Sequence, residues 1–179
     1  TVNRLIRYDA RLNFVSSFKL ESKSAFYPAL FSMDNRQNIY IYYPELNNIY
    51  RTKAFGGKIT QFLDLNSNIS IDNCISDLAL NKVDELALLY KCNSRVHLFS
   101  RSGKIIRRFN IEIINPLIIL PFNLSWLIIN EAGQIEFLDM KPIQLLLDGE
   151  KIKDAIIDKN TLLLLLSSSL IMYEISDGI

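Results

Sequence analysis

The sequence has little of what an active site or a metal centre usually requires. Its 179 residues include one histidine and two cysteines. A single histidine argues against His-rich metal sites and against Ser-His-Asp catalysis. There are only six glycines, and the pair Gly56-Gly57 does not belong to a glycine-rich phosphate loop. We therefore expect no catalytic residue, no bound metal and no cofactor.

The sequence also lacks an excess of charge and a long apolar run. Lys and Arg total 20 against 19 Asp and Glu, a formal net charge of +1, which disfavours general nucleic-acid binding. The longest apolar stretch, Thr161–Tyr173, is interrupted by three serines and is shorter than the roughly 20 residues of a membrane-spanning helix. We expect a turn at the serines, and membrane association only through a segment outside this chain.

What the sequence does contain is a series of short apolar runs separated by turn-forming residues. Runs of this length, bounded by Asn, Asp, Gly, Ser or Lys, are typical of strands rather than helices. Because the runs are continuously apolar, we expect strands that are covered on both faces. Examples are Ile39–Tyr43, Glu85–Tyr90, Trp126–Ile129 and Leu162–Leu166.

These strands recur in a repeating order. Wetter outer hairpins, each a strand, a polar turn and a second strand, begin at intervals of 35 to 47 residues. More apolar inner hairpins lie between them. The outer hairpins start at Arg4, Asn48, Arg95 and Gln134, with a fifth, incomplete one at Ser169, and the inner hairpins start at Ala29, Asp77, Leu117 and Asp154.

Four strands in about 40–45 residues is the period of a β-propeller blade. The sequence therefore predicts an all-β fold of four-stranded antiparallel blades, about four in number, in a single domain spanning residues 1–179. Two arrangements stay open. In a small closed ring, which we favour, N-terminal strands complete the blade that begins at Asp154. In the other arrangement the blades are part of a larger propeller.

One unit resembles a known repeat family. The segment Asn81–Phe109 is similar to an NHL-type propeller repeat, and the elements that match are Asn93, Arg95, Gly103, Lys104 and Phe109. The last two units lack the Asn-x-Arg and Gly-Lys features, so the resemblance is to a divergent, NHL-like propeller. It implies a function among protein binding, RNA binding, sensing and catalysis, because the fold hosts all of these.

The two cysteines are placed to face each other. If the hairpin of Asp77–Lys91 is centred on Val83, Cys74 lies opposite Cys92, with Cβ atoms about 4.5–5.5 Å apart. The sequence thus suggests a cross-strand disulfide, and such a bond favours an extracytoplasmic location. The alternative is a pair of reduced cysteines.

Two further features have a functional and a structural interpretation. His97, between Val96 and Leu98, is expected to be a polar-facing strand residue rather than a catalytic base. A basic cluster could bind an anionic partner, or it could be a solvated hairpin that protects an exposed sheet edge. The cluster consists of Arg95, Arg101, Lys104, Arg107 and Arg108.

These observations favour a non-catalytic binding or scaffolding module, a subunit of a larger assembly whose partner is another protein. Recognition is expected in rim loops such as Pro44–Asn48, Asn66–Asn73 and Lys91–Ser94. The alternative is a sensor or enzyme domain with a site in the central channel, which the almost purely aliphatic inner strands disfavour. A third candidate is an RNA-binding propeller, which the +1 charge disfavours. The sequence does not indicate a small-molecule ligand.

Overall fold

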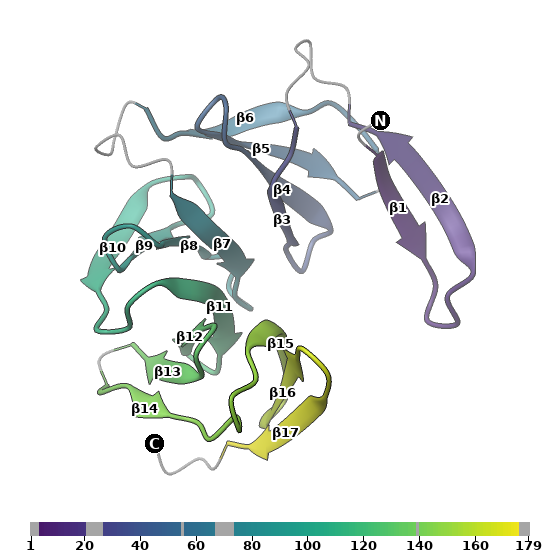
Figure 1. The fold of residues 1–179 in the computed structure, drawn as a ribbon. Coiled ribbons are helices and arrows are strands. Elements are labelled where there is room, and N and C mark those ends of the chain that lie inside the picture. Colours follow the sequence, from purple (N-terminus) through teal and green to yellow (C-terminus); the bar gives the residue numbers. More distant parts are fainter. Residues whose placement is uncertain (1–3, 21–26, 55, 67–73, 139, 176–179) are drawn as a thin grey trace. The chain divides into compact units, whose positions relative to one another are not determined.

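The computed structural model describes residues 4–20, 27–54, 56–66, 74–138 and 140–175. Within these ranges the chain forms seventeen strands in five antiparallel sheets (Figure 1). The described ranges include no helix that could cross a membrane. The chain divides into two compact units, Thr1–Asn73 and Cys74–Ile179, which are described separately. The prediction of one domain over residues 1–179 stays a prediction.

The first unit contains a two-stranded and a four-stranded sheet. The two-stranded sheet pairs β1 with β2, and the other has the order β3-β4-β5-β6. Their bounds are Arg4–Tyr8, Phe14–Lys19, Leu30–Met33, Asn38–Tyr43, Asn48–Lys53 and Thr60–Asp64.

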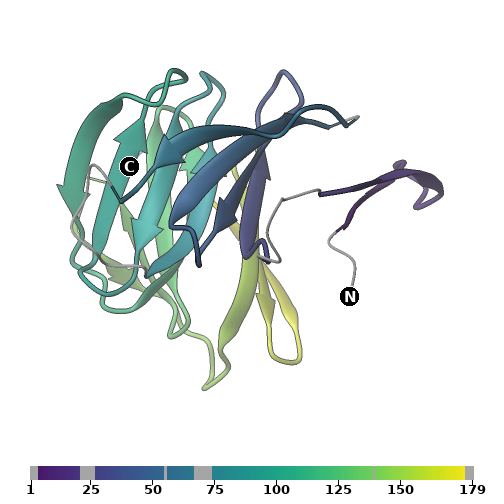
Figure 2. The ribbon, with the colours of Figure 1, turned by 90° about the horizontal axis from the view of Figure 1, so that it is seen from above.

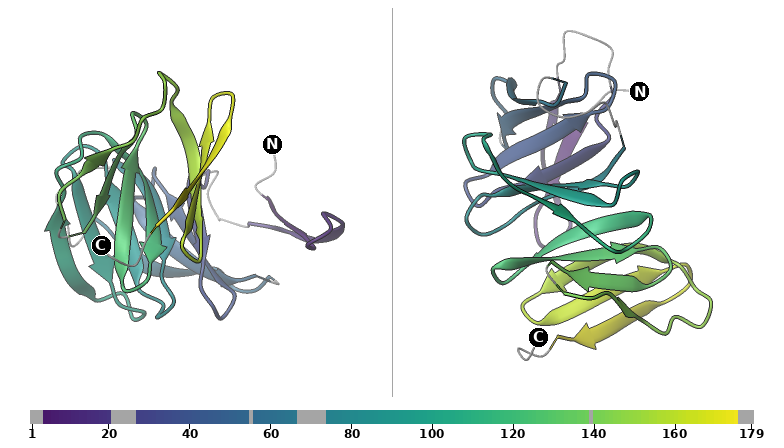
Figure 3. Two further views of the ribbon diagram at one scale, coloured as in Figure 1. Left: turned by 90° about the horizontal axis from the view of Figure 1, so that it is seen from below. Right: turned by 90° about the vertical axis from the view of Figure 1, so that its left-hand side faces the viewer.

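The second unit contains two four-stranded sheets and one three-stranded sheet. The sheet orders are β7-β8-β9-β10, β11-β12-β13-β14 and β15-β16-β17. The strands are Ile75–Leu80, Leu86–Tyr90, Arg95–Phe99 and Ile105–Asn110, then Pro116–Phe122, Ser125–Asn130, Gln134–Phe137 and Ile143–Gln144, then Ile152–Asp158, Thr161–Leu166 and Leu170–Glu174. The right-hand view of Figure 3 shows these three sheets stacked one below another, and Figure 2 shows their twisted strands from above.

Each expected hairpin corresponds to an observed strand pair, and the incomplete fifth one to β17. The prediction of an all-β fold of four-stranded blades is therefore confirmed. The turn predicted at the serines is also found, since Ser167–Ser169 separates β16 from β17. The favoured arrangement, in which N-terminal strands complete the blade of β15, is wrong for the described strands, because β1 and β2 pair with each other and β15–β17 remains a three-stranded sheet.

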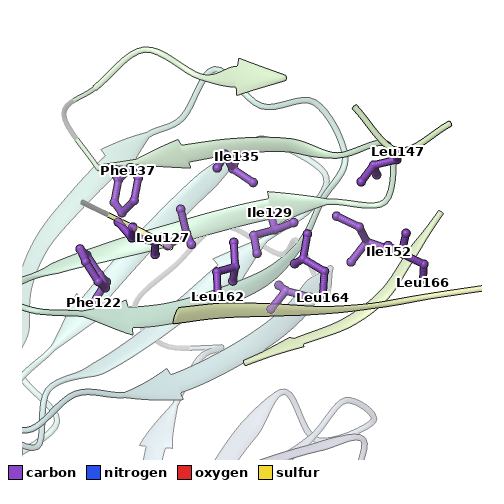
Figure 4. Close-up of a cluster of buried hydrophobic side chains, with 12 residues drawn as sticks. Phe122, Leu127, Ile129, Ile135, Phe137, Leu147, Ile152, Leu162, Leu164 and Leu166 are labelled. Atoms are coloured by element: carbon purple, nitrogen blue, oxygen red, sulfur yellow. The ribbon is translucent and has the colours of Figure 1, made fainter. Parts of the chain in front are cut away.

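The sheets of the second unit are held together by two apolar layers. One layer lies between β7–β10 and β11–β14 and includes Leu89, Val96, Ile119 and Trp126. The other lies between β11–β14 and β15–β17. Figure 4 shows its side chains pointing into the space between the two sheets: Phe122, Leu127, Ile129, Ile135, Phe137, Leu147, Ile152, Leu162, Leu164 and Leu166.

The expectation that Leu162–Leu166 is covered on both faces is wrong. In β16 buried residues alternate with partly exposed ones, because only Leu162, Leu164 and Leu166 join the apolar layer against β11–β14. Leu165 on the opposite face is 49% exposed. A uniform run of leucines hides this difference, since the two faces carry the same residue type.

Four hairpins share a five-residue turn that the sequence analysis did not identify. The turns are Asp9–Asn13, Asp34–Asn38, Asn81–Glu85 and Asn130–Gln134. In each, the Oδ1 atom of the first residue accepts the backbone N–H groups of the third and fifth residues. The side chains of the first and fifth residues also bond each other. The fourth residue has a positive φ: Leu12 63°, Gln37 60°, Asp84 63° and Gly133 85°.

The donor and acceptor in this turn are exchanged between repeats. Where the first residue is Asp, the fifth is Asn and donates its amide hydrogen. Where the first residue is Asn, it donates to a Glu or Gln at the fifth position. Asp84, the fourth residue of the turn Asn81–Glu85, is buried.

Candidate functional site

The residues of the basic cluster are divided by the sheet rather than gathered on one surface. Arg101 and Lys104 lie in the turn between β9 and β10, whereas Arg107 and Arg108 are successive residues of β10. Neighbouring residues of a strand point to opposite faces. Arg107 lies on the face of its cross-strand partner Leu98, and its guanidinium carbon is 4.3 Å from the centroid of the Phe109 ring.

The other two arginines share a face with the only histidine. In the β9–β10 ladder Arg108 lies directly opposite His97, and Arg95 lies opposite Asn110. Since residues two apart on a strand share a face, Arg95, His97 and Arg108 are on the same side of this sheet. The Nε atom of Arg95 donates a hydrogen bond of 3.1 Å to Asn110 Oδ1.

His97 is buried, in contrast to the expected polar-facing position. Its side chain is 4% exposed, and neither ring nitrogen has a hydrogen-bond partner in the part of the chain that the structure describes. The imidazole packs against Tyr90, with ring centroids 4.6 Å apart. Burial, and then the positive charges of Arg108 and Arg95, lower the pKa of His97 to about 4. The imidazole is therefore neutral at pH 7.

The inner strands are not purely aliphatic. Figure 1 shows β7, β11 and β15 on the inner side of the second unit, and β7 and β15 carry Asp77 and Asp154. Asp77 Oδ2 accepts the backbone N–H of Ile119 in β11 at 2.9 Å, and its Oδ1 accepts that of Leu78. Burial raises the pKa of Asp77 to about 6, and the charge of Asp154 adds to the rise.

A β-bulge in each strand explains why the sequence did not predict the positions of these two carboxylates. In β7, β11 and β15 the pairing register shifts by one residue, between Ile75 and Asp77, between Pro116 and Ile118, and between Ile152 and Asp154. Such bulges redirect the following side chain. Asp77 and Asp154 each directly follow the residue that the bulge leaves without a cross-strand partner. No residue type in these strands signals a bulge. Simple alternation therefore could not place Asp77 beside β11.

The two cysteines are joined in a disulfide, with Cα atoms 5.8 Å apart. From Asp77 to Leu89 the hairpin is centred on Val83, as expected. The bulge at Ser76 then shifts the register by one residue, so that Ile75 pairs with Tyr90. Cys74 then also accepts a hydrogen bond at Sγ from the Cys92 backbone, at 3.1 Å. The extracytoplasmic location that a disulfide favours stays a prediction.

The described rim loops are short and are held in place by hydrogen bonds. Pro44–Asn48 turns through Asn47, which has φ 48°, and Lys91–Ser94 turns through Ser94, with φ 47°. Ser94 Oγ donates a hydrogen bond of 2.8 Å to the backbone carbonyl oxygen of Ile113. Of Asn66–Asn73, only Asn66 lies within the described residues. In the described part of the chain no three His, Cys, Asp or Glu side chains are grouped so as to hold a metal ion.

Comparison with known proteins supports the fold class. No family model matches the sequence, and no curated protein matches it. In contrast, solved structures of β-propeller proteins match the structure of this chain. A catalytically inactive virginiamycin B lyase from Staphylococcus aureus, solved with quinupristin, has a TM-score of 0.69 at 16% identity over 95% of this chain and 58% of the lyase.

Two binding proteins match over a similar extent. YCF48 bound to D1 peptide gives a TM-score of 0.67 at 7% identity, over 90% of this chain and 55% of YCF48. BBS1N in complex with ARL6DN gives 0.66 at 13% identity, over 99% of this chain and 56% of BBS1N. By fold the protein is a β-propeller protein, and it spans a little over half the length of these larger propeller chains. The NHL-like family assignment stays a prediction.

Proposed function

We propose that this chain is a non-catalytic propeller module that binds another protein through the outer face of its last sheet. We define this open face by its five apolar side chains, which come from all three strands of the sheet. They are Ile156 of β15, Leu163 and Leu165 of β16, and Leu170 and Met172 of β17.

Strand register brings these side chains into two rows. Ile156 pairs with Leu163, and Leu163 with Met172, while Leu165 pairs with Leu170. Facing side chains on neighbouring strands are close enough to touch, so the rows form one surface. Four of the five are about half exposed or more: Ile156 59%, Leu165 49%, Leu170 62% and Met172 68%.

This exposure is the observation that carries the proposal. Both faces of β11–β14 are covered by apolar layers within the second unit, whereas β15–β17 uses only its inner face there. Contiguous exposed apolar side chains on a folded domain mark interaction sites. Acidic side chains border the open face, namely Asp154 in the row of Leu165, and Asp158 with Glu174 at the other end. The partner surface we expect is therefore apolar at its centre and basic at its edges.

The test is site-specific photocrosslinking in the cell that makes the protein. A photoreactive residue at Met172 is expected to give one discrete adduct with another protein. The matched control places it at Leu124, which is 98% exposed but lies in the β11–β12 turn. Adding Leu170→Asp to the Met172 probe should abolish the adduct. Equal labelling at both positions, or an adduct that survives Leu170→Asp, would contradict the proposal.

A second candidate function is favoured by Asp77. A carboxyl with a pKa of about 6 on an inner strand can exchange protons near neutral pH, as a channel-site enzyme or sensor requires. Asp77 also accepts two backbone N–H groups, which is a structural use of the same carboxylate. Turnover of a small substrate by the purified protein, lost in Asp77→Asn without unfolding, would establish the enzyme and overturn the non-catalytic proposal.

A further inference from the structure

We propose that the partner protein covers the open face with a β-sheet packed like a propeller blade, and that Asp154 accepts a backbone N–H from the edge strand of that sheet. This contact rests on the proposed function, which assigns the open face to another protein, and it specifies the kind of surface which that protein presents. All the strands of this chain that take part belong to the second unit.

The open face matches, residue by residue, a face that is already covered within the second unit. β7 and β15 each contain one bulge, and the pairs that directly follow it are Asp77–Leu89 and Asp154–Leu165. Counting pairs from these bulges across the two sheets aligns the five apolar side chains of the open face with five on β7, β8 and β9. The five equivalents are Ala79, Ala87, Leu89, Val96 and Leu98.

All five equivalents are buried in the apolar layer against β11–β14. In that layer the first strand of the covering sheet, β11, lies against β7 and β8. The open face is apolar at every equivalent position, with Ile156 and Leu163 where the covered face has alanines. Two twisted sheets pack face to face through such side chains. We therefore expect the open face to receive a sheet that lies as β11–β14 lies on β7–β10.

Asp154 supplies a second, polar observation. The Oδ1 atom of Asp77 accepts the backbone N–H of the next residue, and Asp154 Oδ1 does the same, both at 2.8 Å. The shared bond and the shared bulge give the two carboxylates the same local arrangement. Asp77 Oδ2 accepts the N–H of Ile119 in the covering strand β11 at 2.9 Å. Asp154 Oδ2 accepts no hydrogen bond from a described residue, so it is available to a covering strand.

An edge strand is the group that fits this acceptor. The outermost strand of a sheet carries N–H groups that have no partner within that sheet. A carboxylate pairs such a group where the two sheets exclude water, and a hydrogen bond to a charged acceptor is stronger than one to a neutral acceptor. At Asp154 the partner is therefore expected to present a backbone N–H, while a basic side chain can still face Asp158 or Glu174 at the other end of the open face.

The first experiment maps where the photocrosslink attaches in the partner. Photoreactive residues are placed separately at Ile156 and Leu163, and the modified residues are identified by tandem mass spectrometry. Because β11 lies against both β7 and β8, the two probes should attach within one run of up to seven residues, the length of β11, at positions two residues apart. Attachment to separate segments, or to residues three or four apart as on a helix, would overturn the proposal. So would attachment within this chain's own sequence.

The second experiment tests Asp154, with the Met172 crosslink as the readout. Asp154→Leu removes the acceptor and should lower the adduct yield at least about fivefold, whereas Asp154→Asn retains an acceptor oxygen and should keep most of the yield. The matched control is Glu112→Leu, which removes an exposed carboxylate from the β10–β11 connection and should leave the yield unchanged. An equal loss in Glu112→Leu, or a loss in Asp154→Asn as large as in Asp154→Leu, would contradict the N–H contact.

The Met172 adduct separates a failure of this contact from a failure of the proposed function. An adduct that requires Leu170 but not Asp154 would leave the protein-binding role standing and overturn the edge-strand contact. If no adduct forms at Met172, both are wrong. Circular dichroism confirms that each variant is folded, and the attachment positions from Ile156 and Leu163 decide the question if Asp154→Leu is not.

Discussion

At the scale of single residues, His97 and Asp77 make opposite contributions to the pH dependence of stability. His97 has a folded-state pKa of about 4, below its ordinary value, and Asp77 has one of about 6, above its ordinary value. Both shifts arise mainly from burial, which disfavours a charged form. For the histidine the charged form is the protonated one, and for the aspartate it is the deprotonated one, so the same physical cause acts with opposite signs.

For His97 the stability contribution is present above its unfolded pKa of 6.5 and is lost as the pH falls toward 4. At full effect this amounts to about 3 kcal/mol. Replacing His97 by Leu removes the titration, so the variant should lose less stability than the wild type between pH 7 and pH 4. Urea denaturation at several pH values measures this. A His97→Leu variant with the same pH profile as the wild type would contradict the burial of a neutral imidazole.

For Asp77 the change of stability with pH has the opposite sign. Its raised pKa gives a stabilising contribution that is complete below pH 3.8 and is lost as the pH rises through about 6. The Asn side chain in Asp77→Asn can still accept the Ile119 N–H. We therefore expect this variant to be more stable than the wild type at pH 7.5, by up to about 3 kcal/mol, and to converge with it near pH 4. The same urea series tests this, and a variant less stable at pH 7.5 would show that the charged form is preferred.

At the scale of secondary-structure elements, the five-residue turns stabilise the hairpins to different degrees. Asp34 is buried and accepts hydrogen bonds from the Arg36 and Asn38 backbones, the Asn38 amide and the Tyr40 hydroxyl. Asp34→Ala leaves these donors unpaired away from water, at an expected cost of about 2–3 kcal/mol. The matched variant Asp9→Ala removes the same bonds in an exposed turn, where water replaces them, and should cost under about 1 kcal/mol. Thermal denaturation of both variants makes the comparison, and equal losses would contradict it.

The two faces of β16 allow a similar comparison. Leu164 is fully buried in the layer against β11–β14, and its neighbour Leu165 is on the open face. Leu164→Ala should cost about 2–5 kcal/mol through cavity formation. Leu165→Ala should cost under about 1 kcal/mol in the isolated protein and should weaken partner binding instead. Chemical denaturation measures the first effect and the crosslinking assay the second. Equal destabilisation by both would mean that the open face is covered in the free protein.

The strands and hairpins could be predicted from the sequence because they depend on short-range patterns. Apolar runs such as Ile39–Tyr43 and turn residues such as Ser167–Ser169 alternate at the period of a blade. The site could not be predicted in the same way. The burial of His97 depends on tertiary packing, and the position of Asp77 depends on a bulge. Leu165 is exposed because of which sheet packs beside it, a property that no pattern within β16 records.

At the scale of the whole molecule, a β-propeller buries both faces of a blade only where the blade has a neighbour on each side. Here β11–β14 is in that position and β15–β17 has a sheet on one side within its unit. The solved propellers that resemble this chain are longer than it, since it spans 55–58% of the lyase, YCF48 and BBS1N chains. We therefore expect the proposed partner on the open face, the side of β15–β17 against which neither apolar layer of the second unit packs.

The exchanged donor and acceptor in the turns limit how the repeats can diverge. In Asn81–Glu85 an amide faces a carboxylate, and in Asp34–Asn38 the order is reversed. Changing Asn81 to Asp alone would bring two carboxylates together, so the path between the two versions passes through a repulsive intermediate unless residue 85 changes first. Mutational drift at these positions is therefore coupled, and in homologues the first and fifth residues of each turn should covary.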